Sequence, residues 1–278
     1  MKTILLPFSG SDTATAALDT ALVVARNFGS YIEGLFVRQL PPIIAGEGIT
    51  LPGDYMTQLA EESQAQAKFA KEKFEKALSE RGITSGNVAT EGVSAGWCEI
   101  EGTLTQAIGE YGRVFDLIMV ARDEQRTIDW KAACETALFE SGRPVMVAGE
   151  AAPQSIGSNV LVAWNGSTET SRAVAMAMPY LEKANTVKVL TVEGGNVTGP
   201  DAERAAGQLR RHGIDVSAET FDPQGVAIGQ AILDCAQKMN ADLIIKGAYT
   251  HSRLRQMIFG GATSELLNNS TIPVLFCH

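Results

Sequence analysis

The chain has 278 residues and a formal charge of −9 at pH 7, so it is long enough for two domains that each bury a core. Apolar residues make up 45% and charged residues 20%, a balance typical of soluble globular proteins. No apolar run approaches the roughly 20 residues of a membrane-spanning helix. The acidic balance argues against a general nucleic-acid binder.

The first half alternates short apolar runs with longer amphipathic segments, and this alternation predicts strands and helices in turn. Strands are expected near residues 3–8, 31–37, 88–91, 117–121 and 145–148. Helices are expected near residues 13–27, 55–81, 99–111 and 130–140. Residues 39–53 form a long insertion whose apolar side chains must cover something. We expect a lid or an interface loop there.

A small, polar linker at residues 149–158 separates this half from the next. The second half predicts strands near residues 159–163, 187–192, 215–220, 243–246 and 274–277, with a first helix at 168–183. Crossovers long enough for helices predict a parallel sheet covered on both faces.

The two halves repeat each other in sequence. The matched pairs of segments are 4–11 with 160–167, 115–121 with 241–247, and 142–148 with 271–277. Three matches in the same order and at similar spacing indicate a duplication. Ser11 and Ser167 occupy equivalent positions, and each is expected to cap the helix that follows it.

The most informative stretch follows the predicted strand at residues 243–246. Gly247 stands at the end of that strand, and Gly260-Gly261 open the next helix. Glycines let backbone N–H groups approach phosphate oxygens, and a helix N-terminus favours an anion. A hydroxyl and three cations lie nearby in the sequence: Thr263, Lys246, Arg253 and Arg255. These features predict an anion site, while the alternative is a strand-to-helix connection that needs flexible residues.

The first half lacks this pattern. Residues 121–124 are Ala, Arg, Asp and Glu, and Lys131-Ala132 stand approximately where the paired glycines are. Two carboxylates would repel a phosphate chain, and the Cβ atoms would crowd it. We expect that the first half has lost the site.

Other chemistry is not indicated by the sequence. The four cysteines stand singly, without metal-binding spacing, which predicts reduced thiols and a cytoplasmic protein. The first seven residues are too short for a signal sequence and already look like a strand. No Ser/His/Asp, Cys/His or metal-binding constellation is visible, so we predict no catalytic residue and no metal ligand.

The chain resembles a tandem universal stress protein, two copies of that family's domain, over nearly all of both halves. The apolar strand ending in Gly-Ser, the Asp-Leu-Ile-Ile strand and the terminal Ile-Pro-Val-Leu strand carry the resemblance. It implies an α/β fold of two doubly wound domains, residues 1–150 and 158–278. Each would be a five-stranded parallel sheet of order 3-2-1-4-5, Rossmann-like and similar to the adenine nucleotide alpha hydrolases.

Nucleotide-binding members of that family carry G-x2-G-x9-G-[ST] after the fourth strand. Here Thr250 replaces the second glycine and Gly261 replaces the hydroxyl residue. Asn165 stands where the family has an acidic residue, so it brings no charge for a metal or a ribose. Residue by residue, the resemblance implies nucleotide contacts from Ala163, Trp164, Asn165, Val192, Gly247, Thr250, Gly260, Gly261, Ala262 and Thr263.

The resemblance thus implies a cytoplasmic stress-response protein whose second domain binds ATP or another adenine nucleotide. Mg²⁺ would accompany the nucleotide, and hydrolysis would be weak at most. The alternative is a scaffold or interaction protein of the same fold without nucleotide, favoured by the departures at Thr250, Gly261 and Asn165. A third hypothesis, an ATP-dependent enzyme of the pyrophosphatase type, depends on residues 9–12, which are better interpreted as a capped turn.

The resemblance also implies how the halves assemble. Fifth strands are the family's pairing surface, and an exposed apolar edge needs a partner. Pairing of residues 145–148 with 274–277 would make the chain an intramolecular pseudo-dimer. A homodimer of two such chains is a further alternative. Nucleic acid and membranes are not expected as partners.

Overall fold

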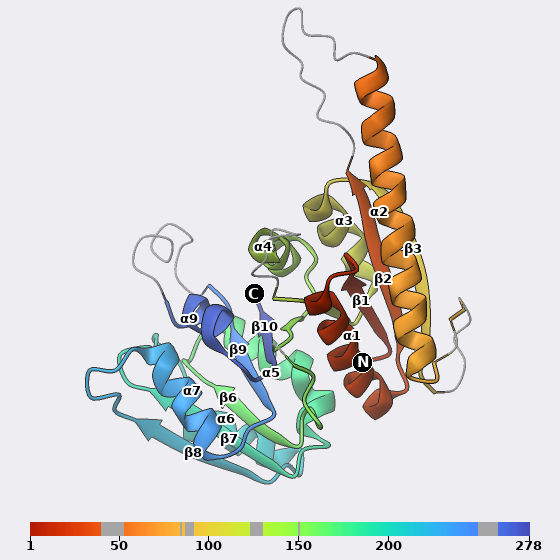
Figure 1. The fold of residues 1–278 in the computed structure, drawn as a ribbon. Coiled ribbons are helices and arrows are strands. Elements are labelled where there is room, and N and C mark those ends of the chain that lie inside the picture. Colours follow the sequence, from red (N-terminus) through yellow and green to blue (C-terminus); the bar gives the residue numbers. More distant parts are fainter. Residues whose placement is uncertain (40–52, 84, 87–91, 123–129, 150, 250–260) are drawn as a thin grey trace, which may run out of the picture. The chain divides into compact units, whose positions relative to one another are not determined.

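The computed structural model describes the chain except for residues 40–52, 84, 87–91, 123–129, 150 and 250–260. The described residues form two compact units, Met1–Ser141 and Gly142–His278, in which strands and helices alternate (Figure 1). Nearly all of the predicted insertion at 39–53 therefore lies outside the described residues. No helix among the described residues is long and apolar enough to cross a membrane.

The first unit follows the predicted order of elements. Its elements are β1 (Thr3–Pro7), α1 (Asp12–Phe28), β2 (Tyr31–Gln39), α2 (Gly53–Glu80), β3 (Ser94–Gly102), α3 (Leu104–Tyr111), the 3-10 turn η1 (Gly112–Val114), β4 (Leu117–Val120) and α4 (Trp130–Glu140). Parallel pairing gives the strand order β3-β2-β1-β4. The central strands β1 and β4 are buried almost throughout, as expected of a parallel sheet covered on both faces.

The second unit begins with the last strand of the first repeat. Its elements are β5 (Val145–Val147), β6 (Asn159–Ala163), α5 (Thr168–Leu181), β7 (Thr186–Val192), α6 (Ala202–Arg211), β8 (Val216–Phe221), α7 (Ile228–Lys238), β9 (Leu243–Gly247), α9 (Ala262–Asn269) and β10 (Val274–Cys277). The parallel strands run β8-β7-β6-β9-β10. This is the predicted order 3-2-1-4-5.

Strand β5 extends this sheet by pairing antiparallel with β10. Val147 lies opposite Val274, Met146 opposite Leu275 and Val145 opposite Phe276. Both strands are buried. The predicted pairing of the two fifth strands is confirmed, and it covers an apolar edge that would otherwise present unpaired backbone groups.

The third strand is where sequence reasoning failed. The predicted strand at 88–91 lies outside the described residues, and the strand that pairs with β2 is β3. The predicted helix at 99–111 is wrong at its start, because β3 runs on to Gly102. Glu99 and Glu101 favoured a helix in the sequence, yet Arg38 of β2 pairs with both carboxylates across the strands, at 3.9 and 2.8 Å. Cross-strand pairing overrides helix propensity here.

Helix starts agree with the sequence. The Ser11 hydroxyl accepts a hydrogen bond from the Ala14 amide at the start of α1, and the Ser167 hydroxyl accepts one from the Thr170 amide in α5. Both predicted N-caps are confirmed. Each cap satisfies one of the free N–H groups at a helix start.

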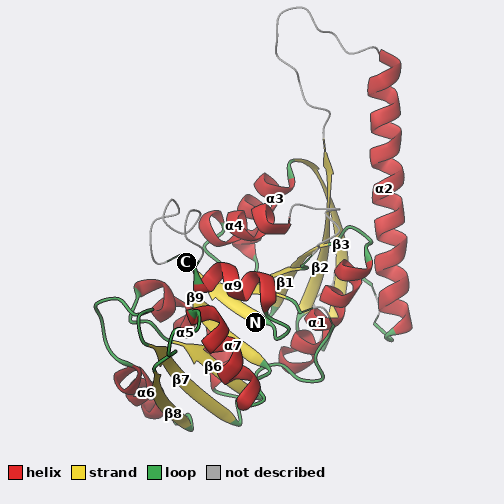
Figure 2. Ribbon diagram, turned by 60° about the vertical axis from the view of Figure 1, so that its left-hand side comes forward, coloured by secondary structure: helices red, strands yellow, loops and turns green. Residues whose placement is uncertain are grey.

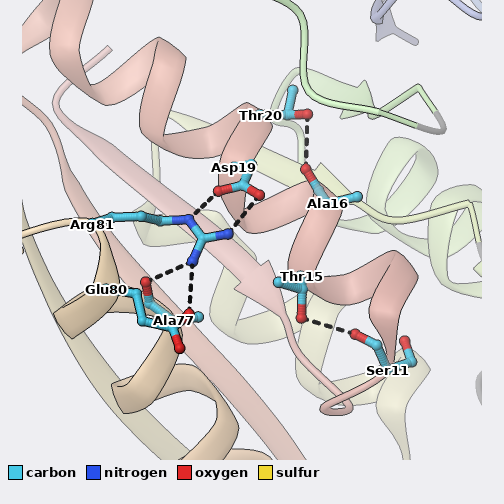
Figure 3. A network of polar contacts seen from close by, with 8 residues as sticks. All are labelled: Ser11, Thr15, Ala16, Asp19, Thr20, Ala77, Glu80 and Arg81. Atoms are coloured by element: carbon cyan, nitrogen blue, oxygen red, sulfur yellow. Dashed lines mark hydrogen bonds and ion pairs between the residues drawn. The ribbon is translucent and has the colours of Figure 1, made fainter.

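The end of α2 is fastened to α1 by an arginine (Figure 3). Arg81 donates from Nε and Nη2 to the two carboxylate oxygens of Asp19, the second contact at 2.7 Å. Its Nη1 also donates to the Ala77 carbonyl oxygen at 2.8 Å. A forked arginine–carboxylate contact fixes direction as well as distance, so it sets where α2 crosses α1.

In each repeat, an aspartate before the fourth strand holds the first strand. Asp116 accepts hydrogen bonds from the amides of Lys2 and Thr3, at 2.6 and 3.2 Å. The carboxylate of Asp242 accepts four, from the Ser155 hydroxyl and from the amides of residues 157, 158 and 159, all between 2.6 and 3.0 Å. These contacts explain the aspartate of the repeated Asp-Leu-Ile segment.

We predict that Asp242→Ala lowers the free energy of unfolding by about 1.5–3 kcal/mol, because it removes charge-assisted hydrogen bonds to three amides. Equilibrium chemical denaturation measures the loss. Asp215→Ala is the matched control, since Asp215 is an exposed aspartate before β8 and should change stability by less than about 0.5 kcal/mol. Equal effects of the two substitutions would contradict the role given to Asp242.

Candidate functional site

The carboxyl ends of β6 and β9 form the point where the strand order of the second unit reverses. The two strands are parallel neighbours, with Ala163 opposite Lys246. From β6 the chain goes to β7 on one side, and from β9 it goes to β10 on the other. Open α/β sheets bind ligands in the crevice outside such strand ends.

Strand register assigns the predicted contact residues to opposite faces of the sheet. Ala163 lies opposite both Lys246 and Leu190, so Ala163, Val192 and Lys246 share one face. Helices α7 and α9 contact each other on this face (Figure 2). Trp164 and Gly247, the neighbours of Ala163 and Lys246, project to the other face. Helix α5 covers it.

Helix α9 begins without a side-chain cap. Its N-cap, Gly261, has extended backbone and offers no side-chain hydrogen bond. Ala262 is the first residue of the helix, and Thr263 is buried in its first turn. The predicted contacts Thr250 and Gly260 lie outside the described residues. An uncapped start leaves N–H groups that an anion can accept.

Lys246, one of the three cations that the sequence places near the predicted anion site, is buried in the structure. Its side chain is only 7% exposed, and Nζ donates to the Gly247 carbonyl oxygen at 3.0 Å. Among the described residues, no carboxylate forms an ion pair with it. Burial lowers the pKa of the ammonium from 10.5 to about 8. A lysine ending an otherwise apolar buried strand was the signal in the sequence, although it was not among the predicted contacts.

Gly247 has a packing reason to be glycine. A Cβ atom built there would lie 2.4 Å from the Thr170 amide nitrogen and 2.7 Å from the Thr170 hydroxyl oxygen. The first turn of α5 therefore approaches the end of β9 more closely than any side chain allows. The glycine brings strand and helix together, whether or not a ligand also approaches the backbone.

Asn165 is engaged by its own loop. Its Oδ1 accepts hydrogen bonds from the Thr170 hydroxyl at 2.6 Å and from the Ser167 amide at 3.2 Å. Its carbonyl oxygen accepts one from the Val197 amide at 2.9 Å. These contacts shape the turn into α5. Among the described residues, no group of three or more His, Cys, Asp or Glu side chains could hold a metal ion.

The equivalent crevice of the first unit is nearly filled. A pocket of about 20 Å³ remains beside Ser9, Val120 and Ala121, and Trp130 lines it. Trp130 begins α4 and is 6% exposed. That volume is of the order of one water molecule.

We predict that Gly247→Ala destabilises the protein by about 1–3 kcal/mol, because the new methyl group would collide with the backbone of α5. Thermal and chemical denaturation measure the loss. Gly207→Ala is the control, since no atom lies within 4 Å of a Cβ built at this position of α6. It should be neutral or stabilising by up to about 1 kcal/mol. Two equal losses would show that the contact with Thr170 is unimportant.

The buried ammonium predicts a pH dependence of stability. The unfolded chain binds more protons than the folded protein between the folded pKa of about 8 and the ordinary value of 10.5. Stability contributed by this group therefore rises through that window. Below pH 8 the charged form is buried, so Lys246→Met should be about 3 kcal/mol more stable than wild type at pH 7. This advantage should shrink towards zero near pH 10.5.

Denaturation of both proteins at several pH values measures this difference. Lys188→Met serves as the control, because the Lys188 side chain is partly exposed and pairs with Glu219 at 2.6 Å. An advantage of Lys246→Met that does not change with pH would contradict the buried charge.

Comparisons with known proteins agree with this architecture. Residues 158–278 match the model of the universal stress protein family. A universal stress protein of Synechocystis sp. is 24% identical over an alignment that covers 99% of each chain. The crystal structure of a universal stress protein from Archaeoglobus fulgidus is similar with a TM-score of 0.70 and 20% identity. That alignment covers 99% of this chain and 95% of the other, and it shows the fold. Residues 158–278 therefore match the universal stress protein family, and the whole chain is similar in sequence and in fold to proteins of that family.

Proposed function

We propose that the second repeat, residues 158–278, binds the phosphate chain of an adenine nucleotide, ATP foremost, at the carboxyl ends of β6 and β9. The chain would act as a cytoplasmic stress-response protein for which binding itself is the signal. The observation that carries the proposal is the uncapped start of α9 on the sheet face that also holds the buried ammonium of Lys246.

The electrostatics of this face favour an anion. A helix start carries a partial positive charge and free N–H donors. An ammonium without a carboxylate partner is costly to bury, and a phosphate nearby would offset that cost. Attraction is stronger in a buried site than in water because the effective dielectric constant is lower. Thr263 adds a hydroxyl at the same helix start.

The difference between the repeats supports a single nucleotide site per chain. Trp130 at the start of α4 lines a pocket of only about 20 Å³ in the first repeat, whereas α9 of the second repeat starts with Gly261 and Ala262. The four cysteines are all free thiols, which supports the proposed cytoplasmic location. The antiparallel pairing of β5 with β10 supports the proposed pseudo-dimer through the fifth strands.

We predict that ATP raises the melting temperature of the full chain. Saturating ligand stabilises by RT ln(1 + [L]/Kd), about 2.7 kcal/mol at 100 times Kd. Lys246→Met and Gly260→Glu should abolish the shift, the first by removing the buried charge and the second by placing a carboxylate in the glycine loop. Ala132→Glu, at the equivalent place in the first repeat, should leave the shift intact.

Proton uptake gives this prediction a specific signature. A bound phosphate should raise the lowered pKa of Lys246, so ATP binding near pH 8.5 should take up protons in the wild type and not in Lys246→Met. Calorimetry in buffers of different ionisation enthalpy measures the uptake. If ATP still raised the melting temperature of both Lys246→Met and Gly260→Glu, the proposed site would be wrong. Turnover within the usual enzyme range of roughly 1–1000 per second would contradict binding as the signal.

The alternative is a scaffold of the same fold that binds no nucleotide. It is favoured by Asn165, whose side-chain oxygen already accepts two hydrogen bonds within its own loop, and by the packing role of Gly247. Any Mg²⁺ in the proposed site would be held mainly by the phosphates of the nucleotide and by water, with few ligands from the protein. The absence of any shift with ATP, ADP or AMP would favour this alternative.

A further inference from the structure

The second unit contains a large groove away from the proposed nucleotide crevice, between helices α5 and α6. We call it the α5–α6 groove, with a volume of about 640 Å³. Its floor is formed by the buried residues Val162, Trp164 and Val189 of the sheet. Such a volume falls within the range of roughly 300–1,000 Å³ typical of small-molecule sites.

The walls of the groove are apolar at depth and polar at the mouth. Val174 of α5 and Leu209 of α6 are buried beside the floor. Arg204, Gln208 and His212 stand four residues apart, so they follow one face of α6, and all three are exposed. A groove with this gradient fits a molecule that is apolar along its length and polar at one end.

The same place in the first unit is filled by aromatic side chains. Phe8, the counterpart of Trp164 in the repeat, packs against Phe74 of α2 with ring centroids 5.2 Å apart. Trp97 lies 5.3 Å from the Phe74 ring. A Cβ at Gly34 would lie only 2.9 Å from both Phe74 and Trp97, so this packing is tight.

Helix α6 carries no aromatic residue in the place of Phe74, and Ala205 faces the groove instead. Trp164 cannot close the space, because its Nε1 donates to the Pro200 carbonyl oxygen at 2.7 Å and holds the ring against one wall. The apolar walls of this open groove stay in contact with water, and an apolar occupant would remove that surface from it. The repeat therefore provides an internal reference in which the same space is occupied by protein.

Charge at the mouth indicates the polar end of the occupant. Among the described residues, no carboxylate forms an ion pair with the Arg204 guanidinium. The nearby Glu203 instead pairs with Arg210, on another side of α6. Gln208 and His212 contact each other at 3.0 Å and add hydrogen-bonding groups beside the arginine.

We propose that the α5–α6 groove binds an amphipathic carboxylate, such as a medium-chain fatty acid, with its chain against Trp164 and Leu209 and its carboxylate on Arg204. The apolar floor recognises the chain by burial. The arginine fork recognises the carboxylate by two parallel hydrogen bonds. This site differs from the proposed nucleotide site, which lies on the opposite face at the end of β6.

The test uses the full chain and sodium decanoate at submicellar concentration, followed by calorimetry, tryptophan fluorescence and melting temperature. Decanoate should bind the wild type, raise its melting temperature and perturb the emission of Trp164. Arg204→Met should weaken binding about tenfold or more, because it removes a charged hydrogen-bond donor. Arg211→Met, which removes an exposed arginine outside the groove, should bind like wild type. Decanol lacks the carboxylate, so its affinity for the wild type should be as low as the affinity of decanoate for Arg204→Met.

Ala205→Phe gives the sharpest control, because it imitates the aromatic filling of the first unit. It should raise the melting temperature without ligand and abolish decanoate binding, while any response to ATP stays unchanged. If this variant does not fold, Arg204→Met and decanol still decide the question.

Three results would overturn the proposal. The first is a decanoate dissociation constant above about 1 mM for the wild type. The second is equal affinity of wild type and Arg204→Met, or of decanoate and decanol. The third is that the wild type binds no decanoate while Ala205→Phe sediments differently from the wild type. That result would make the groove a contact between chains.

Discussion

The fold of each repeat depends on an aspartate that ties the first strand to the start of the fourth. Asp242 accepts hydrogen bonds from three consecutive amides that lead into β6, and Asp116 does the same for β1 with two. A carboxylate can satisfy several backbone donors at once, which no neutral side chain does as strongly. It therefore fixes which strands are neighbours where the order reverses. Because this tie lies at the amino ends of the strands, the carboxyl ends stay open for other chemistry.

On this common frame the two repeats have filled equivalent spaces differently. Trp130 lines the small pocket at the carboxyl ends of the first unit, and Phe74 of α2 packs against Phe8 and Trp97. The second unit has an uncapped helix start in one place and a groove of about 640 Å³ in the other. Large apolar side chains favour stability, whereas open spaces keep a frame available for ligands. Duplication allows one copy to specialise in each direction.

Much of this frame could be predicted from the sequence, because buried parallel strands are continuous apolar runs. The internal repeat also shows each of the matched strands twice. The two N-caps and the strand order of the second unit were predictable for the same reason. The start of α3 was not, since the glutamates of β3 are held extended by Arg38 from a neighbouring strand. Contacts that the residue types alone do not reveal also decide the roles of two predicted site residues, one distant in sequence and one local. Gly247 is small because α5 approaches it, and Asn165 bonds to the helix start that follows.

The two unusual features of the second unit meet at the end of one strand. Ala163 and Trp164 are consecutive, so β6 ends with one residue on the face of Lys246 and the next on the floor of the α5–α6 groove. Burial of the Lys246 ammonium lowers the stability of the empty protein, and the groove leaves apolar surface in contact with water. A ligand that binds only the folded state recovers stability in proportion to the logarithm of its concentration. A ligand at either place would therefore shift the folding equilibrium of the second unit, which is the effect that the proposed binding signal would use.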